Sequence, residues 1–306
     1  MIKGVLGLLL RAVVVLAGTG MATFALLWHA PGDPAQTIAM ARHRALLSQD
    51  IVDQVREQAG LSDGFWSAFF AWAEPLLVLD FGNSSVTGRD VGSDLFTAVT
   101  YTFPLAIAGL LIGLLIALPL AILAARRPGS LMDRCAIAVA SIGAAVPYYW
   151  LGLLLILFFA VQLSWLPAMG ARTPAHAVLP ALTLGLVVAA NLTRIIRSGI
   201  LEAREQSFLP ALQRRAVPKR AIGRDHVAPH AAIPVITVLG LELAFLLEGT
   251  VVVEIVFGRP GLGRFLVGAI ETRDFPQVQA VVLLTALVFV VVNLITDVVY
   301  RLIDPR

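Results

Sequence analysis

Long uninterrupted apolar segments are the feature that most constrains the fold of this 306-residue chain. They occur as blocks of about 20 residues or more, the length that a helix needs to cross a hydrocarbon layer roughly 30 Å thick. Charged residues make up only 14% of the chain, which is too little to cover the surface of a water-soluble protein of this size. We therefore expect an all-α membrane protein, and the short alternating segments of a membrane β-barrel do not dominate.

The apolar blocks predict six membrane spans. They cover approximately residues 12–30, 98–125, 135–163, 177–197, 232–256 and 279–302. The first block is longer than the apolar region of a secretory signal, and no small-x-small cleavage site follows it, so we expect an uncleaved transmembrane helix. The predicted organisation is a first transmembrane helix (1–30), a polar segment (31–97) and a core of five helices (98–306).

Basic residues assign the predicted loops to two sides of the membrane. The loop after the second span and the loop of residues 199–231 are strongly basic, and Arg301 and Arg306 close the chain. Because loops rich in Lys and Arg remain in the cytoplasm, both termini are expected there and the segment 31–97 on the outer side. This distribution accounts for the net charge of +3 without a nucleic-acid partner.

Prolines and aromatic residues mark special places in this pattern. Pro104, Pro119 and Pro147 fall inside predicted spans, where neighbouring helices or water must satisfy the backbone groups that a proline leaves unpaired. This favours a bundle around a cavity that rearranges.

In the outer segment, four aromatic residues indicate either a small ordered element at the membrane surface or an aromatic belt: Trp66, Phe69, Phe70 and Trp72.

The basic loop of residues 199–231 has a helical pattern of its own. Its apolar residues recur at helical spacing and basic residues fall among and after them: Phe208, Leu209, Leu212 and Ala216, with Arg214, Arg215, Lys219 and Arg220. The pattern predicts a short amphipathic helix, a turn at 217–218 and a second short helix. Such an element fits a groove on a cytoplasmic partner, apolar anchors inward and charges at the rim. A basic helix lying on the lipid surface is the alternative.

Residue types that carry catalysis or bind metals are not grouped in this sequence. There is no G-x-x-x-x-G-K-[ST] motif, so nucleotide chemistry is expected on another chain. Cys135 is the single cysteine and the five histidines are scattered, so no metal site, cofactor or catalytic residue is expected. A membrane-embedded enzyme is disfavoured for the same reason.

Polar residues inside the spans are candidates for a transport pathway, because charge at bilayer depth is costly and usually faces the interior of a bundle. We expect Glu242 and Glu248, on the fifth span, to line the pathway and to favour a cationic cargo. A hydrogen bond or ion pair to a neighbouring helix is the alternative for both. Asn191 and Pro147 are further pathway candidates.

An ordered set of short motifs resembles the permeases of the dipeptide/oligopeptide/nickel class of bacterial ABC importers. Any one motif is weak evidence, but their order, with the predicted spans between them, is specific and covers nearly the whole chain. The motifs are 31–34 (PGDP), 80–82 (DFG), 86–91 (VTGRDV), 145–150 (AVPYYW), 179–181 (LPA), 194–198 (RIIRS), 233–234 (IP), 257–264 (FGRPGLGR), 273–276 (RDFP), 292–297 (VNLITD) and 304–306 (DPR).

The resemblance implies a multi-pass permease subunit of the bacterial inner membrane, with a six-helix bundle of the type I ABC importer kind that works by alternating access. It implies a second, related permease in a heterodimer, two ATP-binding-cassette ATPase subunits, and a periplasmic or lipid-anchored substrate-binding protein. ATP hydrolysis would lie on the ATPase subunits, so the chain itself would not be an enzyme. A stand-alone secondary transporter or channel is the alternative, which intramembrane glutamates and broken helices also suit.

The resemblance also assigns roles to particular residues. The coupling segment, which receives the motion of the ATPase, falls on Gln206, Phe208, Leu209, Leu212, Arg214, Arg215, Ala216 and Lys219. Ala216 stands where the family usually has glycine, so either the turn needs no left-handed residue or Pro218 sets it. Asp33, Gly261 and Gly263 match the periplasmic mouth, and Glu254 and Asp297 match structural positions.

Two loops bear on the cargo. Residues 163–170 are similar to nickel-type members, and residues 86–88 to metallophore-type members. These similarities favour nickel or another metal chelate over di- or oligopeptides, although in this class the binding protein selects the cargo.

Overall fold

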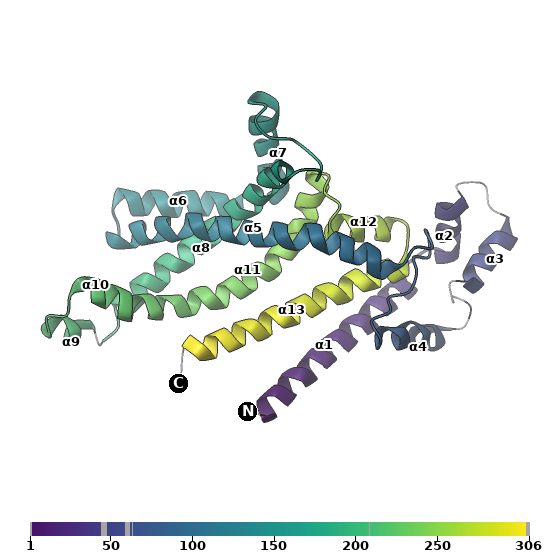
Figure 1. Ribbon diagram of the computed structural model, residues 1–306, viewed down its shortest axis with the longest axis horizontal. Coiled ribbons are helices and arrows are strands. Elements are labelled where there is room, and N and C mark those ends of the chain that lie inside the picture. Colours follow the sequence, from purple (N-terminus) through teal and green to yellow (C-terminus); the bar gives the residue numbers. More distant parts are fainter. Residues whose placement is uncertain (1, 44–47, 59–61, 63, 208, 304–306) are drawn as a thin grey trace. The chain divides into compact units, whose positions relative to one another are not determined.

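The computed structural model describes residues 2–43, 48–58, 62, 64–207 and 209–303. Within them the secondary structure is helical, apart from an isolated antiparallel bridge between Asn83 and Asp90. The chain divides into two units (Figure 1). The first comprises Met1–Tyr101 and Pro260–Val291, and the second Thr102–Arg259 and Val292–Arg306.

Five helices in the described part of the chain are long and apolar enough to cross a membrane. They are Leu10–Trp28, Val91–Arg126, Pro174–Arg204, Lys219–Val256 and Phe275–Val299. A sixth span is present if Leu131–Ala145 and Tyr148–Gln162 are counted as one, and this pair is bent by 103°. The predicted all-α membrane fold is confirmed, but the third predicted span, residues 135–163, is a bent pair instead of one straight helix.

The bend in the third span lies at a single proline. Helix α6 (Leu131–Ala145) stops at Val146, whose backbone is extended (φ −81°, ψ 123°), because a residue before proline avoids the helical region. Pro147 then precedes α7 (Tyr148–Leu155), which continues into the π-helical turn η1 (Ile156–Gln162). The turn between α6 and α7 is visible in Figure 1.

The core of the second unit is built around α8 (Val178–Arg204), which follows the short 3-10 turn η2 (Pro174–Ala177). One side of α8 packs on α5 (Val91–Arg126) and another on α11 (Ala228–Val256). The fully buried members of this cluster include Leu105 and Ala121 of α5, Leu184, Val188 and Leu192 of α8, and Leu246 and Val253 of α11. Membrane helices associate through such close packing, since lipid tails are as apolar as leucine.

Glycines let α5 and α8 approach closely. A Cβ atom at Gly109 would lie 2.7 Å from the Cβ of Leu184, and one at Gly185 would lie 2.6 Å from the Cγ2 of Ile112. These separations are too short for real side chains, so the interface needs small residues at both positions. Pro104 and Pro119 lie inside α5 without ending it, so the predicted interruption occurs at Pro147 and not at these two prolines.

The basic loop of residues 199–231 connects α8 to α11 through short helices at one end of the second unit (Figure 1). They are α9 (Leu209–Arg214), α10 (Lys219–Ala221) and the π-helical turn η3 (Ile222–Val227). The predicted second short helix is not separate, because Lys219–Val256 forms one continuous span. The reason is that Ile222–Val227 keeps a helical backbone through the π turn.

The first unit contains α1 (Ile2–Trp28), α2 (Pro34–His43), α3 (Gln49–Gln58), α4 (Phe65–Leu76), α12 (Leu262–Glu271) and the first part of α13 (Phe275–Ile303). The ring of Phe24 on α1 contacts Phe69 and Trp72 of α4, with ring centroids 5.3 Å and 5.6 Å apart. Trp66 and Phe70 of α4 remain exposed. The outer segment therefore contains an ordered helix, one face of which packs on α1.

Candidate functional site

A polar cluster surrounds the break between α6 and α7. Pro147 lies at the break, and the ring of the next residue, Tyr148, packs on Gly249 of α11, where a Cβ would lie 3.0 Å from the tyrosine Cζ. Glu242 and Glu248 of α11 both lie close enough to Tyr148 to act on it electrostatically. The structure thus places both glutamates within electrostatic range of the residue that follows Pro147. It adds Tyr148, which sequence reasoning missed because a tyrosine in an apolar span is not unusual.

Glu242 lies close to polar groups of α8. Its side chain is buried, with only 6% of the residue exposed, and it lies near the side chain of Asn191. The Asn191 Oδ1 atom accepts a hydrogen bond from the Arg194 Nη2 atom at 3.4 Å. The asparagine amide therefore lies between the carboxylate and a guanidinium one turn further along α8.

Glu248 has a different environment from Glu242. It is exposed in this chain, and six residues of helix place it about 120° around α11 from Glu242. Glu254, the third acidic residue of this helix, is fully buried and accepts a hydrogen bond from the Thr102 hydroxyl at 2.5 Å. Of the three acidic residues of α11, Glu248 alone presents its carboxylate outside the fold of this chain. Asp297, on α13, is exposed as well.

The apolar side of the coupling segment packs into the chain itself. Leu209 is only 4% exposed, and with Leu212 and Val217 it contacts Ala203, Ile222, Val227 and Ala231. This corrects the expectation that the apolar anchors point outward into a partner's groove, because hydrophobic periodicity does not say which surface covers a helix face. The residues that are exposed are Gln206, Pro210, Ala211, Arg214, Arg215, Ala216 and Lys219, while Phe208 lies outside the described residues.

The turn after α9 requires a left-handed residue. Ala216 has φ 55°, so the possibility that this turn needs no such residue is wrong. Pro218 (φ −56°, ψ 135°) has an extended backbone and precedes α10. It does not remove the need for a left-handed backbone at Ala216. A left-handed backbone costs an alanine about 1 kcal/mol relative to glycine.

The C-terminal half of α8 is fixed to α5 and α6. Asp133, near the start of α6, is 2% exposed and binds Arg197 through two hydrogen bonds of 2.5 Å and 2.8 Å. The same carboxylate accepts the backbone N–H of Gly129 at 2.7 Å. About two turns further along, Arg204 donates to the carbonyl oxygen of Ala125. Sequence reasoning missed this ion pair, since Asp133 stands in a basic loop with no sign of its distant partner.

The residues assigned to the outer mouth have structural roles in the first unit. Asp33 accepts the backbone N–H of Ala35 at 3.0 Å and pairs with Arg56 at 2.7 Å. Gly261 precedes α12 with an extended backbone, and Gly263 is buried within that helix. The three residues thus shape the ends of α2 and α12.

Two outer motifs are joined through Arg273 and Asp274. The Arg273 guanidinium donates to the carbonyl oxygen of Pro31 and lies over Gly32, where a Cβ would be 3.0 Å from its Nη2 atom. Asp274 accepts the Ser84 hydroxyl and the backbone N–H of Ser85. The motifs 31–34, 80–91 and 273–276, far apart in sequence, therefore form one outer structure, whereas motif 304–306 lies outside the described residues.

Metal ligands are not concentrated anywhere in the part of the chain that the structure describes. No group of three or more His, Cys, Asp or Glu side chains there is arranged to hold an ion. The candidate site thus consists of the polar cluster around Tyr148 and the basic loop between α8 and α11.

Comparison with known proteins extends this description. Residues 117–306 match a family described as "Binding-protein-dependent transport system inner membrane component". The chain is 35% identical over 304 residues to the glutathione transport system permease protein GsiC of Escherichia coli (strain K12), covering 99% of this chain and 97% of that one. It is 34% identical over 306 residues to the probable peptide ABC transporter permease protein y4tP of Sinorhizobium fredii (strain NBRC 101917 / NGR234), covering 97% and 96%.

Solved structures show the same fold at lower identity. An inward-facing chain of the MetNI methionine ABC transporter superposes with a TM-score of 0.57 and 21% identity, covering 69% of this chain and 96% of that chain. A chain of an amino acid ABC transporter superposes with a TM-score of 0.56 and 18% identity, covering 68% and 94%.

The fold and the polar cluster define a multi-pass transport permease of the inner membrane. The chain belongs to the family of binding-protein-dependent inner-membrane components, as a dipeptide/oligopeptide/nickel-type ABC importer permease. In such importers ATP is hydrolysed by a separate component, and a binding protein delivers the cargo.

Proposed function

We propose that this chain forms one half of the pathway of an ABC importer for small peptides and works by alternating access. The observation that carries the cargo class is the similarity, over nearly the full chain, to permeases named for glutathione and for peptides. This weighs more than the loop similarities that favoured nickel or a metal chelate, because those involve two short segments. The second half of the pathway would be a related permease, and both termini would face the cytoplasm.

The exposed side of the coupling segment is our proposed contact with the ATPase. Pro210, Ala211 and Arg214 lie on the exposed face of α9, and Arg215 and Ala216 continue it. Leu209 and Leu212 fix this surface to α8 and α11 from behind. Motion of an ATPase bound to α9 would therefore be transmitted to α8 and α11 through this packed cluster. The leucines themselves need not touch the partner.

The polar cluster around Tyr148 is our proposed contact with the cargo. A small peptide carries a terminal ammonium group, and two carboxylates near one phenol provide the opposite charge. Glu248 is the more direct candidate because it is exposed in this chain. Glu242 is buried near Asn191 and would act without touching the cargo, by contributing negative potential to the same region.

The proposed function is tested by purifying the chain from its own membranes and by measuring uptake in cells that express the whole importer. We expect ATPase subunits and a related permease to co-purify, and uptake of a labelled dipeptide to require ATP. Nickel uptake without peptide uptake would overturn the cargo class. Transport by the purified chain alone, driven by an ion gradient, would instead support a secondary transporter.

The cationic contact predicts a selective effect of one substitution. We expect Glu248→Gln to lower uptake of a dipeptide with a free amino group about tenfold, the loss of roughly 1.4 kcal/mol of interaction, and to leave uptake of its N-acetylated form unchanged. Glu205→Gln, an exposed position at the end of α8, is the matched control. Equal uptake of the free dipeptide by the Glu248 variant and the wild-type chain would contradict a role in the pathway.

A further inference from the structure

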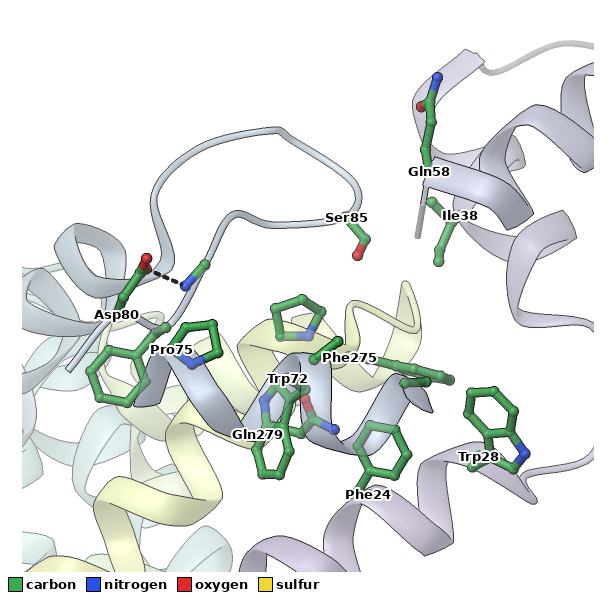
Figure 2. Close-up of a pocket in the computed structure, with 15 residues that line it drawn as sticks. Phe24, Trp28, Ile38, Gln58, Trp72, Pro75, Asp80, Ser85, Phe275 and Gln279 are labelled. Carbon is green, nitrogen blue, oxygen red and sulfur yellow. Dashed lines mark hydrogen bonds between the residues drawn. The ribbon is translucent and has the colours of Figure 1, made fainter. Parts of the chain in front are cut away.

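A pocket of about 360 Å³ lies within the first unit and shares no residue with the polar cluster or the coupling segment. Its walls come from α1, α4, the segment after α4 and the start of α13, with single residues of α2 and α3. Figure 2 shows the aromatic side chains of Phe24, Trp28, Trp72 and Phe275 on one side of it. The pocket is far larger than the space that one water molecule needs.

The pocket lies at the level where two membrane spans end. Trp28 is the last residue of the span Leu10–Trp28, and Phe275 is the first residue of the span Phe275–Val299. Both residues line the pocket. Tryptophan and other amphipathic side chains occupy this depth of a bilayer, where lipid headgroups and the glycerol backbone are found.

A polar side chain lines this otherwise aromatic wall. Gln279 of α13 is only 3% exposed and lines the pocket, and Figure 2 shows it beside Trp72. A glutamine amide offers two N–H donors and a carbonyl acceptor. This position can therefore hydrogen-bond a polar ligand in the pocket.

Charges of opposite sign border the two sides of the pocket. Asp80 lies on one side and uses its Oδ1 atom to accept the backbone N–H of Gly82 at 2.8 Å. On the other side, Arg42 donates to the carbonyl oxygen of Ser85 at 2.5 Å and to the side chain of Gln58 at 3.0 Å. Ser85 and Gln58 line the pocket, so the guanidinium lies directly behind that wall.

We propose that this pocket binds the zwitterionic headgroup of a membrane aminophospholipid of the phosphatidylethanolamine class. The ammonium group would lie near Asp80 and the aromatic faces, which attract organic cations, and the phosphate near Arg42. Gln279 would hydrogen-bond the glycerol ester region. The aromatic walls at interfacial depth favour a lipid over a soluble ligand, since a lipid presents these groups there permanently.

The test measures the lipid retained by the full-length chain. The chain is reconstituted in nanodiscs of equal parts phosphatidylethanolamine and phosphatidylglycerol, extracted in mild detergent, and its bound lipid is quantified by mass spectrometry. We expect the wild-type chain to retain phosphatidylethanolamine about fivefold over phosphatidylglycerol, as a cation–π contact of ordinary strength predicts. Gln279→Leu and Asp80→Asn should each reduce this ratio to about one.

Gln277→Leu is the matched control, because Gln277 is also buried on α13 but does not line the pocket. It should keep the wild-type preference. The Gln279 variant should melt no lower than the wild-type chain, since leucine fills a similar volume in an apolar wall. Equal retention of the two lipids by the wild-type chain, or an unchanged preference in both pocket variants, would overturn the proposal. Displacement of the lipid by soluble glycerophosphoethanolamine would overturn a membrane lipid as the occupant.

Discussion

Ala211→Trp should lower ATP-dependent uptake about tenfold or more while leaving the amount of folded chain unchanged. Ala211 lies on the exposed face of α9, where an indole has room in the isolated chain but would obstruct a partner docked on that face. A loss of roughly 1.4 kcal/mol in the docking free energy already reduces association tenfold. Uptake per folded chain and co-purification of the ATPase subunits measure the effect.

Leu209→Ala separates this docking effect from a folding effect. Leu209 is buried against the chain's own cluster, so its truncation should cost about 2–5 kcal/mol of stability and lower the yield of folded chain. Uptake per folded chain should fall less than in the Ala211 variant. If Ala211→Trp leaves both uptake and co-purification intact, the ATPase does not dock on this face of α9.

Asp133→Ala should destabilise the chain by about 3–5 kcal/mol, because it leaves Arg197 without its partner in a largely buried position. The side chains of the pair are 3% and 19% exposed, so little solvent is available to compensate. Arg197 would also cease to hold α8 against the start of α6. The measurement is the thermal midpoint of the purified chain in detergent.

Arg89→Ala is the comparison for this ion pair. Arg89 and Asp94 are 2.9 Å apart, but the arginine side chain is 67% exposed, and exposed pairs contribute at most about 1 kcal/mol. The two substitutions remove salt bridges of similar length in different environments. A thermal shift no larger for Asp133→Ala than for Arg89→Ala would show that burial does not strengthen the α6–α8 link.

The sequence predicts the helical spans well because the length of an apolar block is a direct measure of what can cross a bilayer. It does not distinguish the prolines. Pro104 and Pro147 both stand inside long apolar segments. However, α5 continues through Pro104, whereas the helix of the third span ends just before Pro147. The difference lies in which neighbouring helices accommodate the freed backbone groups, and this is a property of tertiary packing.

The candidate site could be predicted in part. Glutamates inside apolar blocks are rare enough to identify Glu242 and Glu248 from the sequence alone. Tyr148 and Gln279 carry no such signal, because tyrosine and glutamine are common near span ends. For the coupling segment, the amphipathic pattern predicts that one face is covered. Only the packing of Leu209 and Leu212 shows that the chain itself covers it.

The bend at Pro147 means that the apolar length of this segment no longer equals the membrane thickness that the segment crosses. Residues 131–162 have enough apolar length for one crossing, but their two helical arms meet at 103°. The first arm, α6, has 15 residues and at 1.5 Å per residue extends ~22 Å, about 8 Å less than a typical hydrocarbon layer. The apolar length of this segment therefore overstates the depth that a straight path along α6 can cover.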